Sequence, residues 1–128
     1  MSINLSTGIT CLLKEDIVSL DSLMDKSDTI ECLYVQDCKH LRNTQILKDV
    51  PFKALVDVRI MNCAALRVVK FGFLKRLTIL FLSNNQITSL YGITPLINLT
   101  MLAVDGNKIS NLNELNYLQV LNLKHLYL

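Results

Sequence analysis

The sequence lacks every short motif that would identify a catalytic chemistry. Its 128 residues contain no Gly-x-Ser-x-Gly elbow, phosphate-binding loop, His-Glu-x-x-His site or glycine-rich dinucleotide fingerprint. The only histidines, His40 and His125, are far apart in the chain, and we expect His40 to be a solvated turn residue. Clustered acids for metal or glycoside chemistry are missing too. We therefore predict a noncatalytic protein with no cofactor or metal, and an enzyme only if an active domain lies outside this chain.

Long apolar runs and a strong net charge are also absent. No apolar run approaches the roughly 20 residues of a membrane-spanning helix. The stretch from Met1 to Val18 lacks the basic region and apolar core of a secretion signal. We therefore expect a cytoplasmic or nuclear protein in which the sequons at Asn4 and Asn98 are unused. A net charge of +2 is too mild to indicate a nucleic-acid or membrane partner.

The four cysteines do not follow the spacing of a zinc site, since no Cys-x-x-Cys pair or matching Cys/His set occurs. In a protein without a secretion signal, reduced and mostly buried thiols are the usual outcome. We expect that state for Cys11, Cys32, Cys38 and Cys63.

What the sequence does contain is a repeat, and it is clearest from position 77 to position 112. Its key positions recur at one fixed spacing (77 to 99, 80 to 102, 85 to 107). The alternating Leu-x-Leu part predicts a short strand with one buried face. One such strand cannot close a core, but strands stacked repeat on repeat bury a continuous column of leucines. The recurring residues are Leu77, Leu80, Leu82, Asn85, Ile87 and Leu90, then Leu99, Leu102, Val104, Asn107, Ile109 and Leu112.

The residue that follows each strand motif occupies a turn slot, filled by Asn85 and Asn107 in the clearest repeats. An amide both donates and accepts, so it can satisfy turn backbone groups that would otherwise be buried without partners. The apolar residues after the slot recur at every third position, which suits a 3₁₀-like return. Two earlier repeats align at a slightly longer spacing (30 to 55) and place Cys38 and Cys63 in the same slot.

The whole chain, 1–128, is predicted to form one domain, with about five repeats from 29 to 128. The repeats begin at Ile30, Leu55, Leu77, Leu99 and Leu118, so the last spacing is the shortest (99 to 118). That register places Leu126 in the last turn slot. No polar cap follows, and three explanations stay open: the chain is a fragment of a longer repeat protein, another chain covers the end, or Leu126 and Leu128 fold over it.

Residues 1 to 28 do not fit the repeat. Their apolar residues recur at spacings of three and four with charged residues between them, which predicts an amphipathic helix from Thr10 or Cys11 to about Lys26. Because a solenoid needs its first strand covered, we assign this helix as an N-terminal cap. The alternative is a partner-binding helix.

The segment from 67 to 76 interleaves four cations with Phe71 and Phe73. Basic residues among aromatics can indicate nucleic-acid binding. We expect instead that Val69, Phe71 and Leu74 pack inward while the cations stay in solvent.

Residues between the buried leucines should point out of the sheet and form columns across the repeats. Aromatic residues and Arg are typical anchors of protein interfaces, and exposed apolar clusters mark contact sites. The central column is predicted as Tyr34, Arg59, Phe81, Ala103 and Asn122, flanked by columns that end at Val120 and Lys124. The turn column is predicted as Asp37, Asn62, Asn84, Gly106 and His125. The predicted partner-binding residues are Tyr34, Arg59, Met61, Ile79, Phe81, Met101 and Asp105.

The repeats from 77 to 123 resemble the 22-residue class of leucine-rich repeats, which includes the regulatory subunit of type-1 protein phosphatase and the bacterial internalins. The repeats from 30 to 66 are similar to cysteine-type leucine-rich repeats. The resemblance implies an α/β leucine-rich repeat solenoid, right-handed, with a parallel sheet on its concave side that binds a protein. We expect a regulatory or targeting subunit. The alternatives are the substrate-recognition region of a larger enzyme such as a ligase or kinase, assembly through the open end and, more weakly, RNA binding.

Overall fold

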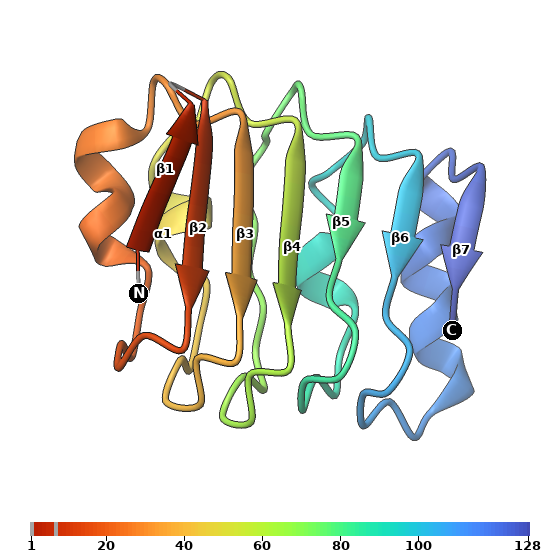
Figure 1. Ribbon diagram of the computed structural model, residues 1–128. Helices are drawn as coiled ribbons and strands as arrows, with labels where there is room; N and C mark the ends of the chain where they lie inside the picture. Colours follow the sequence, from red (N-terminus) through yellow and green to blue (C-terminus); the bar gives the residue numbers. More distant parts are fainter. Residues whose placement is uncertain (1, 7) are drawn as a thin grey trace.

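The computed structural model describes residues 2–6 and 8–128, and the side chains from residue 8 onward. Its strands form one sheet in chain order, from β1 to β7 (Figure 1). Strands β2 to β7 run parallel, and β1 is antiparallel to β2. The predicted parallel-sheet solenoid is therefore confirmed. The strands are β1 (Ser2–Ser6), β2 (Ile9–Leu13), β3 (Cys32–Gln36), β4 (Asp57–Met61), β5 (Ile79–Phe81), β6 (Met101–Ala103) and β7 (His125–Tyr127).

Short helices and irregular segments return the chain from each strand to the next. They are the 3₁₀ helices η1 (Asp21–Lys26), η2 (Tyr91–Ile93) and η3 (Leu112–Val120) and the single α-helical turn α1 (Ile46–Asp49). In Figure 1, α1 lies behind the sheet. In the described part of the chain, no helix has both the length and the apolar character needed to cross a membrane.

The core lies between the sheet and these returns. Alternate residues along the strands point into it, such as Leu33 and Val35 on β3, Leu80 on β5 and Leu82 directly after β5, and all four are fully or almost fully buried. The strand partners Cys32↔Asp57, Asp57↔Ile79 and Ile79↔Met101 follow the spacings predicted from the repeats. The repeat alignment therefore gives the correct register from β3 to β6.

The predicted N-terminal helix from Thr10 or Cys11 to Lys26 is wrong. Ile9–Leu13 instead forms β2. Its residues Thr10 and Leu12 are buried, like their partners Leu33 and Val35 in β3. Only Asp21–Lys26 is helical, as the 3₁₀ return η1. The spacing of three and four arose because a strand and a 3₁₀ return each contribute apolar residues to the same core. This segment is one more coil of the solenoid, and β1 pairs along its outer edge.

The predicted register of the last repeat is also wrong. Leu118 and Leu121 are buried, but they belong to the return η3 and its end, and the strand comes later as β7. Leu102 pairs with Leu126, so the true spacing is longer than the predicted one. A 3₁₀ return of nine residues does not fit within the shorter unit. Leu126 is thus a strand residue, and the central column ends at Tyr127 instead of Asn122.

The segment from 67 to 76 follows the prediction. Val69, Phe71 and Leu74 are buried, whereas its four cations are exposed. His40 lies in a turn and is exposed, with its Nε2 atom 3.8 Å from a carboxylate oxygen of Asp16.

The turn slots follow the strands at one edge of the sheet, each preceded by a residue with positive φ: Asp37, Asn62, Asn84 or Gly106. Only glycine adopts this backbone region at no steric cost, and Asn and Asp tolerate it better than other residues do. The predicted turn column is therefore correct at these four positions, whereas its fifth member, His125, belongs to β7.

Candidate functional site

Tyr34, Arg59 and Phe81 occupy one row across the sheet. They are direct partners in the β3–β4 and β4–β5 ladders, and their side chains lie on the face opposite the buried leucines, which we call the open face. Adjacent strands lie about 4.8 Å apart, so neighbouring side chains in such a row can touch. The row continues through Ala103 to Tyr127.

Asp57 holds Arg59 in place. The two residues are two positions apart on β4, so their side chains emerge on the same face. Arg59 donates from Nε to Oδ1 at 3.1 Å and from Nη2 to Oδ2 at 3.0 Å. This bidentate geometry is the strong form of an arginine–carboxylate pair. The Asp57 side chain is 9% exposed and that of Arg59 is 40% exposed, so the acid forms the floor and the guanidinium the surface.

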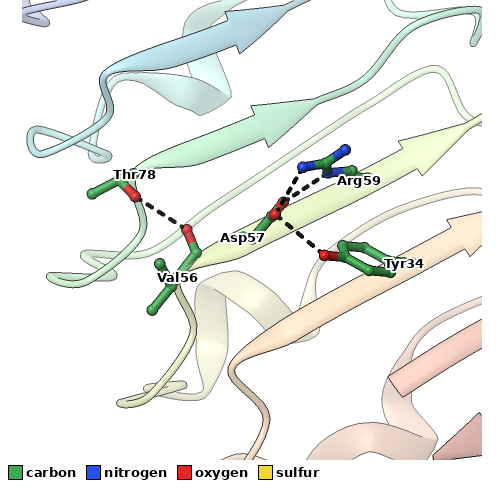
Figure 2. A network of polar contacts seen from close by, with 5 residues as sticks. All are labelled: Tyr34, Val56, Asp57, Arg59 and Thr78. Carbon is green, nitrogen blue, oxygen red and sulfur yellow. Dashed lines mark hydrogen bonds and ion pairs between the residues drawn. The ribbon is translucent and has the colours of Figure 1, made fainter. Parts of the chain in front are cut away.

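Tyr34 completes the cluster. Its hydroxyl donates to Oδ2 of Asp57 at 3.4 Å, as Figure 2 shows. The Arg59 guanidinium carbon lies 5.4 Å from the centre of the Tyr34 ring and 4.7 Å from that of Phe81. Both distances are within the range of a cation–π contact. The guanidinium is therefore fixed by one carboxylate and two rings.

The surroundings in the cluster raise the pKa values of Tyr34 and Arg59. Burial, with a contribution from the Asp57 carboxylate, raises the pKa of Tyr34 to about 12. Hydrogen bonds to Asp57 raise the pKa of Arg59 as well. At neutral pH the phenol is therefore protonated and donating, and the guanidinium is charged.

A second aromatic contact extends the row toward β7. The rings of Phe81 and Tyr127 meet edge to face, with their centroids 6.4 Å apart and their planes at 80°. Such pairs add stability beyond the area that they bury. Ala103, which stands between them in the ladder, is small enough to leave room for this approach and is itself buried.

The remaining predicted residues border this row. Ile79 and Met101 are ladder partners on one side of it, and both are partly exposed. Met61 lies on the other side, where it lines a pocket of about 470 Å³ together with Tyr34 and Arg59. Asp105 is on the same side as Met61 but accepts a 2.6 Å hydrogen bond from the Ser83 hydroxyl, so one of its oxygens is already used.

Two residues of the cluster were not among the predicted site residues. The repeat pattern places Asp57 on the open face but does not by itself indicate a pair, although an acid two positions before Arg59 on one strand face is a readable signal of one. Tyr127 was missed because the last repeat was placed in the wrong register. Aligning Leu126 and Leu128 with Leu102 and Val104 would have revealed it.

The turn-slot residues bind backbone rather than a partner. Asn85 donates to the carbonyls of Ile60 and Leu82 at 2.7 and 2.8 Å and accepts from the Cys63 amide at 2.8 Å. Asn107 bonds in the same way, donating to Leu82 and Val104 at 2.8 Å and accepting from the Ile87 amide at 3.1 Å. The slot residue therefore ties each coil to the one before it.

In the two earlier turn slots a cysteine thiol, which is a weaker hydrogen-bonding group than an amide, takes the position of the Asn side chain. The Sγ atom of Cys38 lies 3.7 Å from the Leu12 carbonyl oxygen, and that of Cys63 lies 3.5 Å from the Met61 carbonyl oxygen. Both thiols are free and buried, and burial raises the pKa of Cys63 to about 11 and that of Cys38 in the same direction. Over the residues that the structure describes, no three His, Cys, Asp or Glu side chains gather as a metal site would require.

Residues 75–117 match the family described as Leucine Rich repeats (2 copies). The matched segment contains β5, η2, β6 and the first part of η3. No curated protein matches the chain. The match shows leucine-rich repeats over residues 75–117, and the sheet of parallel strands shows an α/β repeat solenoid.

Proposed function

We propose that this chain, a leucine-rich repeat solenoid, is a noncatalytic module that binds a protein partner through the open face of its sheet. Proteins with such repeats generally mediate protein–protein interaction, which supports the general role. For the finer role we propose a regulatory or targeting subunit, as the resemblance to the 22-residue class implies.

The observation that carries the proposal is the preorganised Arg59. A free arginine loses rotamer freedom when it binds, and that loss weakens binding. Here Asp57, Tyr34 and Phe81 already fix the side chain before any partner arrives. Aromatic and Arg side chains also dominate the energetics of protein interfaces.

The cluster also indicates what the partner presents. The two hydrogen bonds to Asp57 use Nε and Nη2, which leaves the Nη1 hydrogens for a carbonyl or carboxylate oxygen of the partner. The pocket of about 470 Å³ beside Tyr34, Arg59 and Met61 is large enough for an apolar side chain. We therefore propose a partner that places an apolar residue next to an acceptor oxygen.

Affinity capture from a lysate of the source cells, followed by mass spectrometry, tests this proposal. The binding-face variants are Phe81→Ala and the double change Asp57→Asn/Arg59→Gln, which removes both charges and leaves no unpaired buried carboxylate. The matched control is Tyr91→Ala, because Tyr91 is an exposed aromatic residue in the return η2.

The expected result is a partner captured by the unchanged protein and by Tyr91→Ala, and lost from both binding-face variants. Equal recovery of every captured protein by all four would overturn the assignment of the open face. Circular dichroism of each variant verifies that the fold is retained.

A further inference from the structure

The middle of the chain carries positive charge that the open face does not use. From residue 58 to residue 104 there is no Asp or Glu, whereas Arg59, Arg67, Lys70, Lys75 and Arg76 all fall within this stretch. Arg59 pairs with Asp57. The other four are exposed, and the ion pairs that the structure describes include none of them.

Two of these cations line a pocket of about 430 Å³, together with Lys53. The pocket lies between the segments that lead into β4 and β5, at the edge where the parallel strands begin (the upper edge in Figure 1). Lys53, Lys75 and Arg76 supply its charge, and Pro51, Phe52, Phe73 and Leu74 supply its apolar lining. We call it the basic edge pocket.

The pocket is built by equivalent positions of two neighbouring coils, which are separated by the repeat spacing (51 to 73, 53 to 75). Phe52 and Leu74 are buried and form its floor, whereas Phe73 is 53% exposed. Phe73 therefore places an apolar ring in solvent beside the three cations of the pocket.

Close backbone packing holds Phe73 in this position. The Gly72 amide donates to the Leu47 carbonyl at 3.0 Å, and a Cβ atom at Gly72 would lie 2.7 Å from the Lys48 carbonyl oxygen. Only glycine fits there, so the loop rests directly on the end of α1. The backbone beside Phe73 is therefore held in place before a ligand binds.

The positive charge is confined to two coils. In the coil before, the position equivalent to Lys53 is Asp28. In the coil after, the positions of Lys75 and Arg76 are taken by the uncharged Ile97 and Asn98. The Asn98 side chain donates from Nδ2 to the Lys75 carbonyl at 2.8 Å. A single-stranded nucleic acid uses an extended basic groove with several stacking aromatics, whereas this site is short and contains one exposed ring.

We propose that the basic edge pocket binds an acidic peptide segment of a protein partner, with an apolar side chain of that segment placed against Phe73 and its carboxylates at Lys53, Lys75 and Arg76. Charge complementarity and the apolar floor select this occupant. The site is separate from the open face, so it provides a second contact, independent of the one proposed for Arg59 and Phe81.

The test is a titration of the isotope-labelled full chain, followed by NMR of the backbone amides. The probe is the blocked peptide Glu-Glu-Phe-Glu-Glu. Two comparison peptides, Glu-Glu-Ser-Glu-Glu and Lys-Lys-Phe-Lys-Lys, remove the apolar side chain and reverse the charge. A short uridine oligonucleotide represents single-stranded nucleic acid.

The acidic phenylalanine peptide is expected to shift the amides of 52–53 and 73–76 in a saturable way and to bind more tightly than the other three probes. Lys53→Gln/Lys75→Gln is expected to weaken it roughly threefold to tenfold, since each exposed ion pair contributes a factor of up to about five. Phe73→Ala is expected to weaken it as well. Lys108→Gln, a charge change at another exposed site, and Asp57→Asn/Arg59→Gln, at the open face, should leave it unchanged.

The proposal would be overturned by no shift of these amides, by an affinity unaffected by Lys53→Gln/Lys75→Gln, or by tighter binding of the oligonucleotide at the same residues. Loss of peptide binding in Asp57→Asn/Arg59→Gln would also overturn it, because it would place the peptide on the open face. The amide spectrum of each variant, recorded before the titration, checks that the fold persists.

Discussion

Asp57 is the residue on which the open face depends. A carboxylate that is nearly buried is costly unless it is paired, and removing one partner leaves an uncompensated charge. Arg59 and Tyr34 supply the pairing. Arg59 therefore stabilises the fold as well as presenting its guanidinium, which is why the proposed binding test changes Asp57 and Arg59 together.

The raised pKa of Tyr34 gives a prediction in alkaline solution. In an ultraviolet titration of phenolate absorbance, one of the four tyrosines is expected to ionise with a pKa of about 12. In Asp57→Asn its pKa should be lower than in the unchanged protein, because the neighbouring negative charge is gone, but burial should still keep it above the ordinary value.

The raised pKa of Tyr34 also makes the stability of the fold depend on pH. The pKa of Tyr34 is higher in the folded protein than the ordinary value of 10.0. The contribution of Tyr34 to the free energy of unfolding is therefore fully present below pH 10 and is lost as the pH rises toward 12. Urea unfolding across this range measures the loss. If all four tyrosines ionised together near the ordinary pKa, the cluster would not exist as described.

The cysteines differ in a way that alkylation can detect. Cys38 and Cys63 are buried and burial raises the pKa of each thiol, whereas Cys11 and Cys32 are partly exposed. Since the thiolate is the reacting form, iodoacetamide at neutral pH should modify Cys11 and Cys32 first. Peptide mass spectrometry reads the order. Early modification of Cys63 would contradict the buried slot.

At the scale of the element, the coils from β3 to β6 could be predicted from sequence because each repeats one pattern. Strand register follows from the recurrence of Leu33, Val58, Leu80 and Leu102, and that register places Tyr34, Arg59 and Phe81 in one row. The end coils could not be predicted in this way. Their returns differ in length, and in β2 the inward position is taken by Thr10 rather than by an apolar residue.

The side-chain contacts within the row could not be predicted from the repeat pattern either. The strand register predicts that Arg59 lies beside Tyr34 and Phe81. It does not predict that the Arg59 guanidinium turns back along its own strand to Asp57. That choice depends on how the acid is desolvated by the side chains around it, which is a property of the folded sheet.

Leu82 tests the core of one coil. Its side chain is fully buried, so Leu82→Ala should lower the free energy of unfolding by about 2–5 kcal/mol, through lost burial and the cavity left behind. Chemical denaturation measures it. Phe81→Ala, next in sequence but on the open face, should cost less, and the reverse order would mean that the two faces are exchanged.

Asn85 tests the link between coils. Asn85→Ala removes the bonds to the Ile60 and Leu82 carbonyls and to the Cys63 amide, leaving buried groups unsatisfied. The expected cost is about 1–3 kcal/mol for each group that water cannot reach. Asn85→Cys should recover part of it, since Cys63 fills the same slot one coil earlier. No difference between the two variants in urea unfolding would contradict a role for the slot side chain.

The molecule as a whole is a row of coils in which each coil contacts mainly its neighbours. Its surfaces are therefore assembled from equivalent positions in adjacent coils, and each position can vary without disturbing the core. The open face derives its cluster from β3, β4, β5 and β7, and the basic edge pocket derives from the segments before β4 and β5 (Figure 1). The two proposed contacts can be tested independently because they share no residue.

The central claim is that the open face binds a protein, and calorimetric titration of the captured partner tests it most directly. The dissociation constant of the unchanged protein is compared with those of Asp57→Asn/Arg59→Gln and Tyr91→Ala. The predicted result is at least about tenfold weaker binding by the first variant, as for the loss of an interface anchor, and no change in the second. Equal affinity of all three proteins would contradict the claim and move the binding surface away from Arg59.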